Sequence, residues 1–101
     1  MIINLLRVVC FATLLLLSAC GAIQYTTQMQ NAERTFREAR AEKAHERAAY
    51  EYFYAKTYLN QARKEAARSS YENAIRYAET AEKHFAIALK VARQRRAEKG
   101  Q

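Results

Sequence analysis

Residues 67–81, with the sequence ARSSYENAIRYAETA, interrupt one helical pattern and begin another. Ser69 and Glu72 have the S-x-x-E spacing of a capping box, in which the serine side chain bonds a free backbone amide and the glutamate bonds back. A connection this tight favours two helices that run antiparallel, like a hairpin. We therefore expect one helix to end just before this point and the next to cover residues 70–97.

Heptad spacing continues on both sides of this break. After it, the apolar positions at 3-4 spacing are Tyr71, Ala74, Ala78, Ala81, Phe85, Ala88 and Ala92. Before it, they are Ala48, Tyr52, Ala55, Leu59, Ala62 and Ala66. Both series are packing seams of the coiled-coil type, and their many alanines allow two helix axes to approach closely.

The composition supports a helical body. Proline is absent, and the two glycines, Gly21 and Gly100, lie at the ends of the pattern, so nothing between them breaks a helix. The sequence predicts an all-α fold, a two-helix antiparallel hairpin over residues 25–99 that follows a cleaved signal peptide. Its long first helix covers residues 25–68, its shorter second helix covers 70–97, and 100–101 form a tail.

The first twenty residues differ in kind from the rest. Arg7 is their only charged side chain, and residues 8–17 (VVCFATLLLL) form an almost uninterrupted apolar run. A helix that spans a bilayer needs about 20 apolar residues, and residues 8–23 fall short of that length. A signal peptide over residues 1–19 is the favoured interpretation, and an uncleaved membrane anchor is the alternative.

Small residues surround the cysteine that ends this run. The segment Leu17-Ser18-Ala19-Cys20 resembles the lipobox of bacterial lipoproteins in all four positions. The resemblance implies cleavage between Ala19 and Cys20, with Cys20 carrying a thioether-linked diacylglycerol as the acylated first residue. A buried structural cysteine is the remaining alternative for Cys20.

The lipobox resemblance also implies a location. Residues 20–24 would form a lipidated tether, and Gly21 directly after the cysteine favours the outer membrane over retention in the inner one. We therefore expect a protein of the cell envelope, anchored by its N-terminal lipid at the periplasmic face of the outer membrane. Apart from this covalent lipid on Cys20, we expect no cofactor.

A second apolar stripe lies on the opposite side of the predicted first helix from its seam. It begins with Tyr25, Met29, Ala32, Phe36 and Ala39 and continues into Tyr50, Phe53 and Tyr54, interrupted by charged residues at 43–47. A single hairpin has nothing to cover this stripe. Because aromatic residues are enriched at interfaces, we interpret part of it as a partner-binding surface. Its predicted members are Tyr25, Met29, Phe36, Tyr50, Phe53, Tyr54 and Tyr58; ordinary exposed tyrosines are the alternative.

The C-terminal end is strongly basic. The formal net charge of the chain is +7, and the last twelve residues carry Lys90, Arg93, Arg95, Arg96 and Lys99 against Glu98 alone. Such a patch is typical of contact with nucleic acid or with an anionic surface. Export makes nucleic acid a poor candidate, which leaves an anionic surface, or simple stabilisation of a helix C-terminus by cations.

Little in the sequence indicates catalysis. All ten acidic residues are glutamate, and His45 and His84 lie on separate predicted helices without neighbouring cysteine or aspartate. No glycine-rich loop is present to bind a phosphate. We expect a protein that is not an enzyme, with no metal site and no small-molecule substrate.

Two further resemblances concern the helices. Residues 70–81 look like the second helix of a tetratricopeptide repeat, although Glu65 stands where the preceding helix of that repeat has tyrosine. Residues 48–92 resemble an alanine-rich helical-hairpin domain of unknown function found in short bacterial lipoproteins. That family implies a fold but no activity.

Two functions remain open at this level. The favoured one is a membrane-anchored lipoprotein that acts as a structural or scaffold component of a cell-envelope complex, through helix packing with an envelope protein or a second copy. The alternative is a spacer that binds the cell wall or another anionic surface through its basic C-terminal end.

Overall fold

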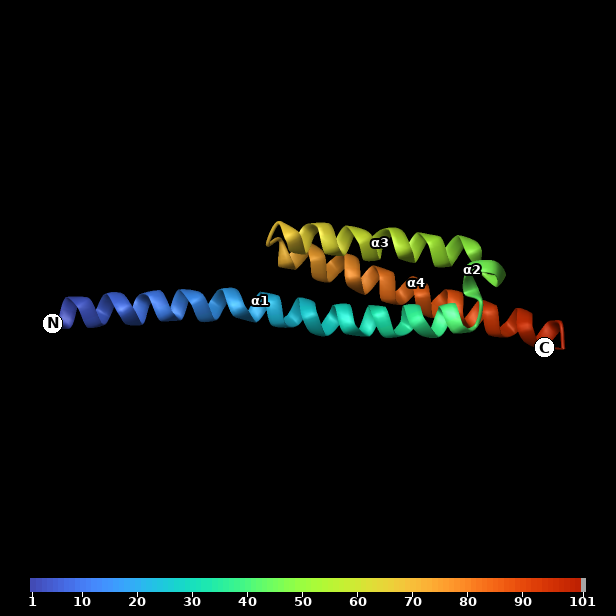
Figure 1. Ribbon diagram of the computed structural model, residues 1–101, viewed down its shortest axis with the longest axis horizontal. Coiled ribbons are helices and arrows are strands. Elements are labelled where there is room, and N and C mark those ends of the chain that lie inside the picture. The colour runs from blue at the N-terminus through green and yellow to red at the C-terminus, as the bar shows by residue number, and fades with distance from the viewer. Residues whose placement is uncertain (101) are drawn as a thin grey trace.

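The computed structural model describes residues 1–100, apart from the side chains of 17–19. The described chain is helical almost throughout: α1 covers Ile2–Ala41, α2 Ala44–Arg47, α3 Ala49–Ala67 and α4 Tyr71–Glu98. Figure 1 shows an elongated molecule in which α4 lies between α1 and α3, and the Cα atoms span 75 × 18 × 13 Å. Gln101 of the predicted tail lies outside the described residues.

The helices form a three-helix bundle with a long extension. The chain runs out along α1, turns through α2, returns along α3 and runs out again along α4, so that α1 and α4 are parallel (Figure 1). The α4 backbone packs closely against both neighbours, whereas α1 and α3 meet mainly through side chains such as Glu33 and Arg63. The N-terminal half of α1 projects beyond the bundle.

Alanine dominates the core, and a group of three aromatic rings fills its widest part. The alanines at the predicted seam positions of α3 and α4 are buried, except Ala66, which is half-buried. Phe85 of α4 is fully buried, with its ring centroid 5.0 Å from that of Phe36 of α1 and 5.8 Å from that of Tyr52 of α3. Phe36 and Tyr52 stack at 5.8 Å. Each of the three long helices therefore contributes one ring to this aromatic triad.

The predicted two-helix hairpin is wrong. Residues 25–68 do not form one helix, because the chain breaks at Glu42 and Lys43 and reverses through α2. The reversal brings the stripe of Met29, Ala32 and Ala39 against α4, where these residues are buried. Burial of that stripe decides the fold, since residues 41–48 are otherwise good helix formers with no local reason to stop.

Both turns use a residue other than glycine in the left-handed region. Lys43 has φ 58° and Ser69 has φ 62°. At the second turn, the Ser70 amide donates to the Glu65 carbonyl and the Ser69 amide to the Ala66 carbonyl, which is the Schellman pattern of a helix C-terminus.

The position of the second turn was predicted correctly, but its mechanism was not. The N-cap of α4 is Ser70 and not Ser69, it makes no side-chain capping hydrogen bond, and the Glu72 carboxylate accepts from Arg76, so the capping box expected from Ser69 and Glu72 does not form the start of α4. Helix α4 begins and ends one residue later than the predicted 70–97. Backbone hydrogen bonds at the end of α3, rather than serine side chains, close this turn.

Ser69→Gly should stabilise the bundle by about 1 kcal/mol, because glycine adopts positive φ without the steric cost that a side chain meets there. Urea unfolding of the full-length chain in neutral detergent, followed by circular dichroism, measures the change. Ser70→Ala is the control and should be nearly neutral, because that side chain makes no cap. A loss of stability in Ser69→Gly would contradict this account.

Phe85→Ala should destabilise the bundle by about 3–5 kcal/mol, because it opens a cavity where all three helices meet. The matched control is Phe53→Ala, whose side chain is 52% exposed and should contribute less than about 1 kcal/mol. The same urea titration compares the two. Equal losses would show that the aromatic triad does not organise the core.

Candidate functional site

The apolar extension changes into packed bundle at the predicted lipidation site. Residues 1–16 and Cys20 are exposed, whereas burial begins at Gly21, where an added Cβ would lie 3.4 Å from Cβ of Tyr71. Tyr25 packs beside the same residue, with ring centroids 6.1 Å apart. The side chains of Leu17, Ser18 and Ala19, the other lipobox positions, lie outside the described residues. Residues 20–24, the predicted tether, are helical.

The first half of α1 is compatible with a signal sequence or a membrane anchor. It is long and apolar enough to cross a membrane by length and composition, and none of its apolar window is buried in the bundle. Ile2, Leu6, Phe11 and Leu14 are among its exposed side chains. Such a surface is unfavourable in water and favourable in lipid.

Three residues predicted to bind a partner belong to the core or pack against it. Met29 is buried, Phe36 is part of the aromatic triad, and Tyr25 is half-buried. The first half of the stripe is thus covered by α4 of the same chain. It needs no second protein to shield it.

The remaining predicted residues stay on the surface of α3. Tyr50 is 76% and Phe53 52% exposed, and Tyr54 is half-buried; we call these three residues the aromatic strip. The rings of Tyr50 and Tyr54 stack at 6.1 Å. Tyr58, half-buried, lies one turn further along and packs against Tyr77 of α4. The strip occupies the first turns of α3, at the end of the bundle away from the N-terminal extension (Figure 1).

A polar pair lies beneath the aromatic strip. His84 Nδ1 of α4 lies 2.7 Å from a Glu51 carboxylate oxygen of α3, and both side chains are about three-quarters buried. The Tyr54 ring packs 4.4 Å from the His84 ring. The hydrogen bond that Tyr54 donates to the Tyr58 hydroxyl raises the pKa of the Tyr54 phenol. The pair thus supports the Tyr54 ring, and it was not predicted from sequence.

A groove borders the aromatic strip on the α1 side. Its volume is about 310 Å³, and its lining residues are Phe36, Arg40, His45, Tyr52, Phe53 and Lys56. Nδ1 of His45 is buried with no hydrogen-bond partner among the described residues. Arg40 and Lys56 place positive charge at the rim, and the lining contains no carboxylate. The groove therefore combines aromatic rings and a buried imidazole with cationic side chains.

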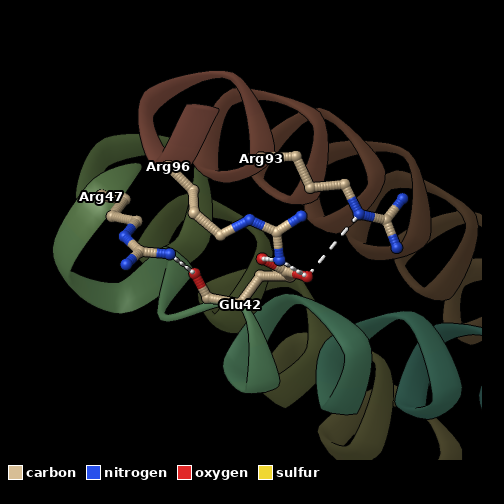
Figure 2. Close-up of polar contacts among 4 residues, drawn as sticks. All are labelled: Glu42, Arg47, Arg93 and Arg96. Atoms are coloured by element: carbon tan, nitrogen blue, oxygen red, sulfur yellow. Dashed lines mark hydrogen bonds and ion pairs between the residues drawn. The ribbon is translucent and has the colours of Figure 1, made fainter. Parts of the chain in front are cut away.

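The five residues of the predicted basic C-terminal patch have different surroundings in the structure. Figure 2 shows Arg93 and Arg96 reaching the Glu42 carboxylate, at 3.9 Å and 2.7 Å, while Arg47 donates to the Glu42 backbone oxygen at 3.2 Å. Arg95 donates in turn to the backbone oxygen of Arg47. Arg47 and Arg95 thereby satisfy carbonyls at the C-termini of α1 and α2, whereas Arg93 and Arg96 pair with a side-chain carboxylate. Much of the patch therefore fastens α4 to the α1–α2 turn.

Two arginines of this network and two lysines line a neighbouring cleft. It has a volume of about 280 Å³, and we call it the distal cleft; its lining residues are Lys43, Glu46, Arg47, Arg95 and Lys99. Lys90, the fifth residue of the predicted patch, is exposed on α4 and does not line the cleft. The sequence patch thus missed Lys43 and Arg47, which the fold brings beside the end of α4.

Metal and catalytic groups were not expected from the sequence. Within residues 1–100, no three His, Cys, Asp or Glu side chains lie close enough together to hold a metal ion. Cys10 and Cys20 are both free and exposed. His45 and His84 lie in different settings, the first at the groove and the second paired with Glu51.

Comparisons with known proteins identify a family but no activity. Residues 27–101 match the family described as a domain of unknown function, DUF4398. No curated protein and no solved structure matches the chain. The lipobox and tetratricopeptide resemblances gain no support from these comparisons. Because the match covers well over half of the chain, this protein belongs to the DUF4398 family.

Proposed function

We propose that this protein is a lipid-anchored component of the cell envelope, without catalytic activity, that works as a structural adaptor. The observation that carries the proposal is the boundary at Cys20. On its N-terminal side lies an exposed apolar helix, and on its C-terminal side a packed bundle begins within one residue. A cysteine at that boundary is suitably placed for the lipidation and cleavage that the lipobox resemblance implies.

The lipid would hold the bundle firmly to one membrane. Each buried methylene contributes about 0.8 kcal/mol, so two or three acyl chains anchor a protein almost permanently, whereas one myristoyl chain does not. Outer-membrane placement at the periplasmic face is part of this proposal and rests on Gly21 after the cysteine. From Cys20 to Ala41, α1 extends about 30 Å at roughly 1.5 Å per residue. The aromatic strip would therefore be presented away from the lipid.

The proposed partner is an acidic surface on another envelope protein. Tyr50 and Phe53 offer apolar area with little conformational entropy to lose on contact. Arg40 and Lys56 lie at the rim of the adjoining groove, so a partner with carboxylates around an apolar patch complements it. The net charge of +7 disfavours a second copy of the same chain at this surface.

The alternative function, a spacer that binds an anionic surface through the basic end, also has an observation in its favour. Arg95 and Lys99 of that end line the distal cleft, and neither forms an ion pair among the described side chains. The two functions use different residues and are compatible within one molecule.

Cys20→Ser should abolish acylation and signal cleavage. Mass spectrometry of the membrane fraction should find the wild-type chain beginning at an acylated residue 20, and the variant uncleaved. Cys10→Ser is the matched control, because Cys10 is equally exposed in the same helix but lies outside the lipobox. A Cys20→Ser protein that is still processed and membrane-bound would refute lipidation and favour an uncleaved anchor.

A photo-crosslinking amino acid at Tyr50 or Phe53 should capture one acidic envelope protein in intact cells, whereas the same group at Lys83, exposed on α4, should not. Tyr50→Glu should reduce the crosslink from position 53, since it places a like charge against an acidic partner. Mass spectrometry identifies the captured protein and its charge. Capture of a second copy of this chain, or equal capture from position 83, would contradict the proposal.

A further inference from the structure

The distal cleft combines positive charges from three separate segments. Lys43 comes from the turn after α1, Arg47 from α2, and Arg95 and Lys99 from the end of α4. The single carboxylate in the lining belongs to Glu46, which lies 3.7 Å from His45 Nε2. Four cations and one anion therefore line one concave surface, which gives it a strongly positive potential.

Hydrogen bonds to backbone oxygens of Glu42 and Arg47 account for the positions of Arg47 and Arg95, but they do not account for the two lysines of the cleft. Glu42 lies next to Lys43 in the sequence, yet its carboxylate accepts from Arg96 at 2.7 and 2.8 Å. Among the described residues, Lys43 and Lys99 form no ion pair. These two lysines add positive charge beside two arginines without a paired carboxylate of their own, and such repulsion lowers the stability of the fold.

The backbone at Lys43 adds a second destabilising feature at the same place. With φ 58°, this residue occupies a conformation that glycine and asparagine adopt at much lower cost. Strain and charge repulsion therefore coincide on one lysine of the cleft. Features of this kind are typical of sites where stability is exchanged for binding.

We infer that the distal cleft binds phosphate groups. Guanidinium groups present forked N–H donors that match phosphate oxygens, and lysine adds mobile point charges around them. Two arginines and two lysines supply both kinds of contact here. The inference goes beyond the proposed adaptor function and requires neither lipidation of Cys20 nor the aromatic strip.

The position of the cleft limits the source of the phosphate. It lies at the end of the bundle opposite the apolar extension, about 30 Å along α1 from Cys20. The Debye length at physiological salt is about 8 Å, so headgroups of the anchoring membrane exert little attraction there. Two sources remain, a soluble or polymeric phosphate and the headgroups of a second, facing membrane.

Titration calorimetry on the full-length chain, reconstituted in phosphatidylcholine vesicles, tests the inference with sodium tripolyphosphate as the probe. The double variant Lys43→Asn with Lys99→Gln should bind at least about tenfold more weakly, because it removes two charge-assisted contacts. Its midpoint of thermal unfolding should not fall, since asparagine tolerates the left-handed conformation. The control, Lys64→Gln with Lys83→Gln, removes the same charge from exposed sites elsewhere and should bind within twofold of wild type.

Two further arms distinguish the outcomes. In the first arm, phosphatidylglycerol vesicles are added to the vesicles that carry the protein, and light scattering measures whether the two kinds of vesicle cross-link. Cross-linking identifies lipid headgroups as the source of the phosphate. Binding of tripolyphosphate without cross-linking identifies a soluble phosphate. Either result supports a phosphate site if the double variant of the cleft lysines loses phosphate binding and the control double variant retains it. Citrate bound as tightly as tripolyphosphate, equal losses in both double variants, or no binding of either phosphate probe would overturn the inference.

Discussion

The contact among Phe36, Tyr52 and Phe85 is the interaction on which the rest of the bundle depends. Most other buried positions are alanine, which bring the helices close together but bury little area each. Three rings with centroids 5.0 to 5.8 Å apart supply the large apolar contact that alanine cannot. Since each ring comes from a different helix, this one cluster fixes both the reversal after α1 and the return along α4.

The sequence contained the packing seams but not their full arrangement. Spacing alone placed Tyr52, Leu59 and Phe85 in a core, because a heptad series depends only on local periodicity. It did not place the first reversal, since residues 41–48 favour helix and no glycine or proline marks a stop. The sequence did contain one signal of the reversal. On one continuous helix, the apolar stripe that ends at Ala39 and the seam that begins at Ala48 would lie on opposite sides. That change of side marks the turn at Lys43.

The same missed turn decides which of the predicted surface residues are covered and which are exposed. Residues on the α1 side of the stripe, such as Met29, were assigned to a partner because a hairpin leaves them uncovered, and α4 covers them instead. Tyr50 and Phe53 follow the turn and stay exposed. Lys43 and Arg47 were not grouped with Lys99 because they lie about fifty residues away in the sequence, although an antiparallel pairing that sets Ala48 beside Ala92 already brings them near the end of α4. Charge clusters that depend on tertiary contacts are invisible to a count along the chain.

The absence of a break in α1 between Cys20 and the bundle governs how the molecule can move. Gly21 already lies against Tyr71, so no stretch of loose chain separates the proposed site of acylation from the folded body. A flexible linker would let the body sweep a hemisphere above its anchor, with its far end spending much of the time near the lipid. A continuous helix instead makes the body one rigid rod that pivots as a unit about the lipid linkage and diffuses in the plane of the membrane. Its far end stays at a fixed distance from that linkage, so a partner beyond this distance is out of reach.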